Sequence, residues 1–217
     1  MTPRPKMDQE LVEINNKVTQ MSEKVEEAIV DSLRAIKEKD MELARKIIDN
    51  DTQIDDMEDE INEMCFLFLA TQQPLASDLC YCISIMKMVT DLERIGDHCE
   101  DLAKYAIRME HQEYYKELID LPRMADMAAR MVKNSIRAFL GRDLKLARKV
   151  WKADEEVDEL YRDVYEEQLD IAVADNANTR LSIMFAFVAA HLERIADYAT
   201  NICEETVFSL EGAYEME

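Results

Sequence analysis

The sequence LERIGD at residues 92–97 returns one hundred residues later as LERIAD at residues 192–197. A near-identity of six residues within one chain indicates an internal duplication. On a helix, residues four apart project in directions that differ by only about 40°. Each copy therefore presents a Glu and an Asp on the same helix face, where two carboxylates are available at one place.

The duplication extends well beyond this motif. SLRAIKEKD at residues 32–40 matches SIRAFLGRD at residues 135–143, and ISIMKMVTDLERIGD at residues 83–97 matches IMFAFVAAHLERIAD at residues 183–197. The repeated unit is thus roughly 100 residues long, and two copies are too few for a solenoid. A paired helical bundle is the expected arrangement.

Glycine and proline are scarce, with three Gly and four Pro among 217 residues. Because both residues interrupt helices, their scarcity predicts helix through most of the chain. Apolar residues recur at steps of three and four along residues 7–39, 41–71 and 76–109, as in amphipathic helices. The expected fold is all-α, with two tandem three-helix bundles at residues 1–118 and 119–217.

The chain is strongly acidic, with 47 acidic and 26 basic residues and a net charge of −21. This charge repels a phosphate backbone, so no nucleic-acid partner is expected and small cations are the natural ligands. The sequence contains no stretch of signal-peptide type and no uncharged run that could span a membrane, which predicts a soluble, cytoplasmic protein. Five cysteines without CxxC spacing are expected to be reduced and mostly buried.

A second acidic pair, again four residues apart, recurs at equivalent positions of the two copies: Asp51 with Asp55, and Asp154 with Asp158. If the second and third helices of each copy pack side by side, these pairs converge with the acids of the LERIGD and LERIAD motifs. The predicted ligand sets are Asp51, Asp55, Glu93 and Asp97 in the first copy and Asp154, Asp158, Glu193 and Asp197 in the second. A solvated, exposed helix face is the alternative interpretation.

Carboxylate oxygens favour Mg²⁺, Ca²⁺, Mn²⁺ or iron over Cu or structural Zn. The three histidines do not change this expectation. On straight helices, His98 and His191 project away from Glu93 and Glu193, and His111 lies near a helix end. None of the three follows a Glu by three residues, the spacing of the ferritin-like di-iron motif. We therefore expect each histidine to be a core or surface residue.

The duplicated three-helix unit, with DxxxD on its second helix and LERIxD on its third, resembles the PhoU family of phosphate-uptake regulators. LATQQPLASDL at residues 69–79 is also similar to the family's link between these helices. The resemblance covers nearly the whole chain. It implies a homodimeric cytosolic adaptor without enzymatic activity, which reports phosphate sufficiency from a phosphate ABC transporter to a sensor histidine kinase and restrains phosphate-starvation genes.

The same resemblance implies metal ions on the surface at the acidic pairs, in the form of iron clusters or of Mn, Mg, Ca or Zn ions. It adds two peripheral candidates, Asp101 and Asn201, to the eight carboxylates named above. The family commonly has Asn where Asp101 stands, so the first site is expected to hold metal more tightly. The family also has Arg where this chain has Cys80, whereas the second copy keeps Arg180.

Two other functions are compatible with the residues alone. A cluster of metal ions on carboxylates can activate water, so a metal-dependent hydrolase is one alternative. A structural helical interaction module, with acidic faces that are only solvated, is the other. The sequence offers no nucleophile paired with a base and no Gly-rich phosphate loop, which favours the adaptor over the hydrolase.

Overall fold

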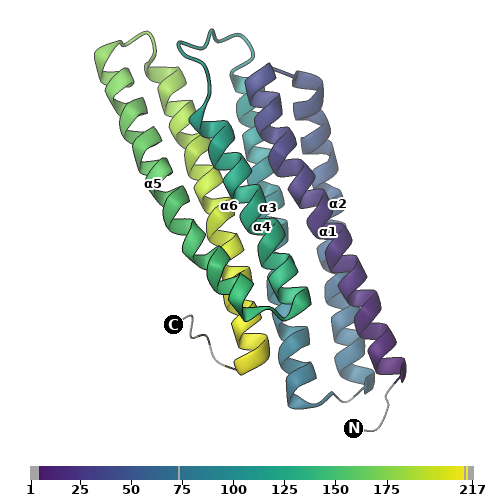
Figure 1. Cartoon of the computed structure of the whole chain (residues 1–217). Helices are drawn as coiled ribbons and strands as arrows, with labels where there is room; N and C mark the ends of the chain where they lie inside the picture. Colours follow the sequence, from purple (N-terminus) through teal and green to yellow (C-terminus); the bar gives the residue numbers. More distant parts are fainter. Residues whose placement is uncertain (1–4, 73, 213, 215–217) are drawn as a thin grey trace.

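Six long helices account for nearly all of the described chain, and they run side by side (Figure 1). The computed structural model describes residues 5–72, 74–212 and 214, and no strand occurs within them. The helices are α1 (Pro5–Glu38), α2 (Met41–Gln72), α3 (Ala76–Arg108), α4 (Asp120–Gly141), α5 (Leu144–Ala174) and α6 (Thr179–Glu211). The predicted all-α fold with two three-helix units is confirmed.

The turn between the first two helices of each copy is built in the same way. Lys39 and Arg142 adopt a left-handed conformation, with φ of 55° and 53°, and each is followed by an aspartate. The carboxylates of Asp40 and Asp143 accept hydrogen bonds from backbone N–H groups three residues further on, at 2.9 and 3.0 Å. This capping satisfies amide groups that the first turn of a helix leaves free. Asp40 and Asp143 are therefore the N-caps of α2 and α5.

Four helices form the centre of the bundle. Within the described residues α1 packs against α3 and α4, and α6 also packs against α3 and α4. α2 lies outside this group against α1 and α3, and α5 lies outside it against α4 and α6. Each copy therefore exposes the outer face of its second helix, and the two copies meet through α3 and α6 and through α1 and α4.

The apolar stripe of α1 is covered by the chain's own helices. Ile14, Val18, Met21, Val25 and Ile29 are each at most 1% exposed and belong to one hydrophobic core that runs through both copies. Burial of each such side chain contributes about 1.5–3 kcal/mol relative to exposure. This stripe therefore stabilises the monomer and is not available as a dimer surface.

The five cysteines are free thiols, and all except Cys80 are buried. The prediction that they are reduced and mostly buried is confirmed. None of the helices in the described ranges combines the length and the apolar character needed to cross a lipid bilayer.

Candidate metal centre

The first acidic cluster lies where α2 packs beside α3. It comprises three carboxylates from each of these helices: Asp51, Asp55, Glu58, Glu93, Asp97 and Glu100. Burial, together with the charges of Asp55 and Asp97, raises the pKa of Asp51 to about 6. Burial, together with repulsion from Asp97 and Glu58, raises the pKa of Glu93 to about 7. Carboxylates of α2 and α3 thus face one another, as expected if these two helices pack side by side.

Two carboxylates of the first cluster, those of Glu58 and Glu100, do not belong to the predicted set of four ligands. Glu58 is held toward α3 by the hydroxyl of Thr90, which donates a hydrogen bond to its Oε1 at 2.6 Å. Glu100 lies close enough to Asp51 and Asp97 to raise the pKa of both carboxyls, after the effect of burial. Glu100 was missed by the sequence analysis, although its spacing of three residues from Asp97 places it on the same helix face.

The second acidic cluster lies at the equivalent place between α5 and α6, and it consists of the four predicted carboxylates Asp154, Asp158, Glu193 and Asp197. Burial, together with the charges of the other three carboxylates, raises the pKa of Asp154 to about 6. Burial and the charge of Asp158 also raise the pKa of Asp197. Tyr161 occupies the position that Glu58 holds in the first copy.

One buried oxygen of the second cluster is unsatisfied. Within the described part of the chain, Oδ1 of Asp154 is buried and has no hydrogen-bond partner. A buried acceptor without a partner costs free energy, and a carboxylate oxygen is also a preferred ligand of hard cations. A cation at this position would therefore remove an energetic penalty of the folded chain.

The arginines of the LERIGD and LERIAD motifs, Arg94 and Arg194, contact different residues. Arg94 reaches back to Asp91, with 3.7 Å between the guanidinium and the carboxylate. Arg194 instead contacts Asp197 at 3.7 Å and Glu193 at 3.9 Å, both of them members of the second cluster. The second cluster is therefore partly neutralised by its own arginine.

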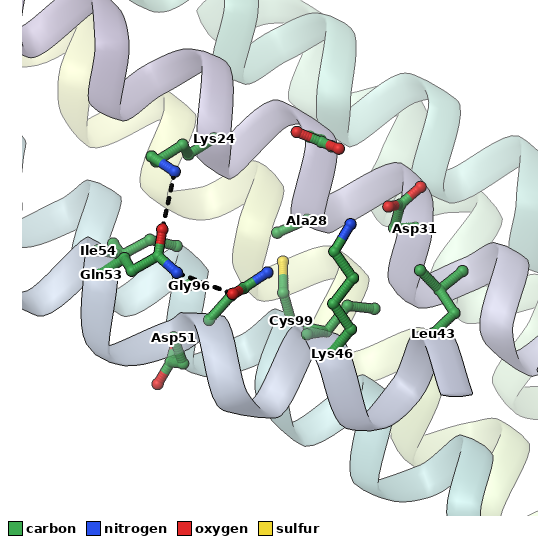
Figure 2. Close-up of a pocket in the computed structure, with 13 residues that line it drawn as sticks. Lys24, Ala28, Asp31, Leu43, Lys46, Asp51, Gln53, Ile54, Gly96 and Cys99 are labelled. Carbon is green, nitrogen blue, oxygen red and sulfur yellow. Dashed lines mark hydrogen bonds between the residues drawn. The ribbon is translucent and has the colours of Figure 1, made fainter. Parts of the chain in front are cut away.

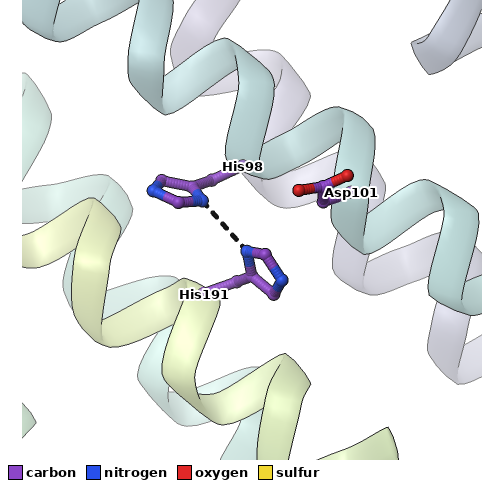
Figure 3. Close-up of side chains that lie close together, drawn as sticks. All are labelled: His98, Asp101 and His191. Carbon is purple, nitrogen blue, oxygen red and sulfur yellow. Dashed lines mark hydrogen bonds between the residues drawn. The ribbon is translucent and has the colours of Figure 1, made fainter.

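Within each cluster, carboxylates of the two helices face each other, but they do not surround a single point. Among the residues that the structure describes, only one group of three potential ligands has its ligand atoms all within 4.8 Å of one another, and it is His98, Asp101 and His191 (Figure 3). Mutual repulsion favours a spread arrangement of unneutralised carboxylates. Binding one ion through three of them would require side-chain rotation.

The two peripheral candidates lie on the contact between α3 and α6. Asp101 lies beside His98 and His191, and its charge also raises the pKa of Asp97 after the larger effects of burial and of other acids. Asn201 forms a hydrogen bond with Asp91 of α3. Both positions therefore connect the two copies of the repeat.

Figure 3 also shows that the two histidines, which the sequence analysis treated as separate residues, approach each other across the α3–α6 contact. Their Nδ1 atoms are 2.9 Å apart. Burial, together with proximity to His191, lowers the pKa of His98 to about 4. Since the two residues are 93 positions apart, no local spacing rule could have paired them.

The helices carrying the first cluster approach closely at Gly96. A Cβ atom on Gly96 would lie 3.0 Å from Cδ1 of Ile54 and 3.3 Å from Oδ1 of Asp51. In the second copy the equivalent residues are Ala196 and Val157, so the added methyl group faces a shorter side chain. The glycine thus permits the close packing that brings Asp51 to the α3 side.

A cavity of about 220 Å³ lies behind the first cluster, between α1 and α2. Its wall includes a chain of polar contacts from Lys24 to Gln53 at 3.0 Å and from Gln53 to Asn50 at 2.8 Å (Figure 2). In the same view the carboxylate of Asp51 points away from Lys24. Asp51 lines this cavity and also belongs to the first cluster, so the cavity adjoins the cluster.

A family model described as the PhoU domain matches the chain twice, at residues 18–106 and 121–206. The chain belongs to the PhoU family. Among curated PhoU proteins, the "phosphate-specific transport system accessory protein PhoU homolog" of Clostridium acetobutylicum is 35% identical over 206 residues, which cover 94% of each chain. The corresponding protein of Aquifex aeolicus is 36% identical over 207 residues, or 95% of this chain and 94% of that one.

Solved PhoU structures have the same architecture. PhoU from Pseudomonas aeruginosa superposes with a TM-score of 0.91 at 32% identity, covering 95% of this chain and 99% of that one. The phosphate transport system regulatory protein PhoU from Streptococcus pneumoniae gives a TM-score of 0.88 at 30% identity, covering 96% and 99%. PhoU proteins are regulatory accessory proteins and not enzymes, which removes the hydrolase alternative.

Proposed function

We propose that this chain is a metal-binding regulatory adaptor of phosphate uptake. In this role it would act at the cytoplasmic face between a phosphate ABC transporter and a sensor histidine kinase, and it would restrain phosphate-starvation genes when phosphate is sufficient. Its membership of the PhoU family and the names of its relatives as accessory proteins of phosphate-specific transport support the transport part of the proposal.

The observation that carries the metal part is the repetition of an acidic cluster on equivalent helices of both copies. The members common to both are the eight predicted carboxylates, and in each cluster burial and mutual repulsion raise several of their pKa values. The unsatisfied Oδ1 of Asp154 adds an acceptor that a cation would complete. The donor set contains only oxygen atoms, which fits iron, Mn²⁺, Mg²⁺ or Ca²⁺.

Bound cations would change the surface of the adaptor. The chain carries a net charge of −21, and the two clusters concentrate part of that charge on the contacts between α2 and α3 and between α5 and α6. An ion held by both helices of a pair would reduce their repulsion and stabilise their contact. Occupancy could then be sensed by a partner that docks on these outer helices.

Metal analysis of protein purified without chelators tests the metal part directly. We expect bound metal in the wild type and a reduced content in the double variant Glu93→Ala with Asp97→Ala. Glu159→Ala with Asp163→Ala is a matched control, because these acids are also four apart on a helix, α5, but belong to neither cluster. Unchanged metal content in the first variant would remove the first cluster from the proposal.

Pull-down with the transporter ATPase and with the kinase tests the adaptor part, and a phosphate-starvation reporter in cells that lack the protein tests negative regulation. We expect capture of both partners and a derepressed reporter. Failure of capture under phosphate-rich, metal-loaded conditions would refute the adaptor role. The homodimer implied by family resemblance is tested by light scattering of the purified chain.

A further inference from the structure

The contact between α3 and α6 has two ends that the internal duplication makes equivalent. At an offset of one hundred residues His98 corresponds to Tyr198, Asp101 to Asn201, and Asp91 to His191. One end of the contact brings together His98, Asp101 and His191, and at the other end Asn201 lies beside Asp91. Both ends are built on the same contact between two helices. At the first end, all three side chains are potential metal ligands.

We propose that His98, Asp101 and His191 form a binding site for Zn²⁺ or a similar borderline cation, distinct from the acidic clusters. We call these three residues the imidazole site. Two imidazoles and one carboxylate are three ligands of a type that Zn²⁺ commonly uses, and a fourth position remains for water. The carboxylate clusters favour harder cations, so the chain would hold two classes of metal.

The distances of the imidazole site suit one ion. Two nitrogens at about 2.05 Å from a tetrahedral Zn²⁺ lie about 3.3 Å apart, and at a right angle they lie about 2.9 Å apart. The Nδ1 atoms of His98 and His191 are 2.9 Å apart, and a carboxylate oxygen of Asp101 lies within 4.8 Å of both ligand atoms. An ion could therefore be inserted with small side-chain adjustments.

The surroundings hold the two rings in place. Tyr198 lies 5.7 Å from the ring of His98, and Tyr105 lies 5.8 Å from the ring of His191, measured between ring centroids. All three residues of the imidazole site are partly buried, so solvent competes less for their ligand atoms. Such packing limits ring rotation before an ion arrives and so reduces the entropic cost of binding.

Nearby positive groups leave the ligand atoms accessible. Lys104 contacts Oδ1 of Asp101 at 3.2 Å, which leaves Oδ2 for an ion, and Lys104 also pairs with Glu100. The exposed guanidinium of Arg194 is close enough to His98 to lower the pKa of that imidazole. The ion pairs of Arg194, however, are with acids of the second cluster. A bound ion would connect α3 to α6 and hence the first copy of the repeat to the second.

Titration of the metal-free full chain with Co²⁺, in the presence of excess Mg²⁺ to occupy the acidic clusters, tests the imidazole site. We expect one equivalent to develop the visible absorption of tetrahedral Co²⁺ and to be displaced by Zn²⁺. His191→Ala and His98→Tyr should each weaken this binding by more than about 100-fold, since loss of a supporting residue alone costs up to that much. The tyrosine is the residue that the second copy carries at the equivalent position.

His111→Ala is the matched control, because His111 is exposed and is the one other histidine of the chain. It should leave the Co²⁺ equivalent unchanged. NMR of ¹⁵N-histidine-labelled protein gives a readout that does not depend on the variants: Zn²⁺ should shift the signals of two histidines and leave the third. A Co²⁺ equivalent that survives both His191→Ala and His98→Tyr, or Zn²⁺ that moves no histidine signal, would overturn the proposal.

Discussion

The two copies of the repeat place carboxylates on equivalent helices, but different side chains lie beneath these carboxylates where the helices pack. Gly96 faces Ile54 in the first copy, and Ala196 stands opposite Val157 at the equivalent positions of the second. The methyl group gained at position 196 is balanced by the carbon lost at position 157, so the summed side-chain volume is conserved. Volume-conserving exchanges are the kind that a core tolerates best.

The charges of the copies have diverged further than their packing. The first cluster contains six carboxylates, of which only Glu100 pairs with a lysine, Lys104, in the described chain, and the nearby Arg94 pairs outside the cluster with Asp91. The second contains four carboxylates and pairs internally with Arg194. The two copies have therefore kept the same helix contacts. The first cluster has more uncompensated negative charge than the second, so a bound cation would stabilise it more.

The largest expected difference between the copies is in metal affinity. We expect the first cluster, isolated by Glu193→Gln with Asp197→Asn, to bind Mn²⁺ about tenfold more tightly than the second cluster, isolated by Glu93→Gln with Asp97→Asn. The reason is its greater number of unneutralised carboxylates. Calorimetric titration measures both constants.

A control for this affinity difference is Arg194→Gln, which should strengthen Mn²⁺ binding at the second cluster by removing its internal cation. Equal affinities of the two clusters would show that the surplus acids of the first cluster take no part in binding. A tighter second cluster would contradict the expected order.

The pH dependence of stability should also separate the copies. Asp51 and Asp154 have pKa values of about 6 and Glu93 has one of about 7, all above the values of unfolded carboxyls. The folded metal-free chain therefore binds more protons than the unfolded chain, and these groups lose their stabilising contribution as pH rises from about 4 to about 7. We expect the free energy of unfolding to fall by on the order of 2 kcal/mol over this range, after discounting for solvent screening.

Urea unfolding at a series of pH values measures this slope. Asp51→Asn with Glu93→Gln should flatten it more than Asp154→Asn does, and saturating Mg²⁺ should flatten it in the wild type. A metal-free stability that rises between pH 4 and pH 7 would contradict the raised pKa values of these carboxyls.

Close packing at Gly96 gives a smaller effect. We expect Gly96→Ala to destabilise the chain by about 1–2 kcal/mol, because overpacking against Ile54 outweighs the gain in helix propensity. Adding Ile54→Val should recover most of that loss by reproducing the pair found in the second copy. Chemical denaturation of the single and double variants measures the coupling, and additive effects would show that the two side chains do not compete for space.

The smallest expected difference is between the two N-caps. Asp40→Ala and Asp143→Ala should each cost about 1 kcal/mol, because each removes one side-chain hydrogen bond to a free helix amide. Thermal unfolding of the two variants should give nearly equal losses. A clear inequality would indicate that the turns of the two copies differ in ways that their φ angles do not show.

The sequence predicted the helices closely because their signals are local. Apolar residues at steps of three and four along residues 7–39, 41–71 and 76–109 gave boundaries that agree with α1, α2 and α3 to within a few residues. The internal alignment also identified the carboxylates that face each other between α2 and α3, since equivalent positions were retained in both copies. Metal binding at these carboxylates stays a prediction.

Contacts between the two copies were not accessible in this way. Asp101 and Asn201 could be assigned to a helix face, yet each also lies beside a residue of the other copy, His191 and Asp91 respectively. His98 and His191 were each considered in relation to their own helix only. Their pairing follows from the register in which α3 packs against α6, and that register is set by the shared core.

By itself, the sequence determined that the chain is helical, that it is duplicated, and that each copy carries two acidic pairs on helix faces, because all three are properties of residue order along one helix or between two aligned segments. The tertiary structure alone decided that α1 buries its apolar stripe within the monomer and that α3 brings His98 and Asp101 to His191 of α6. These features depend on how separate helices pack in three dimensions. Packing is cooperative over the whole core, so no short stretch of sequence specifies it.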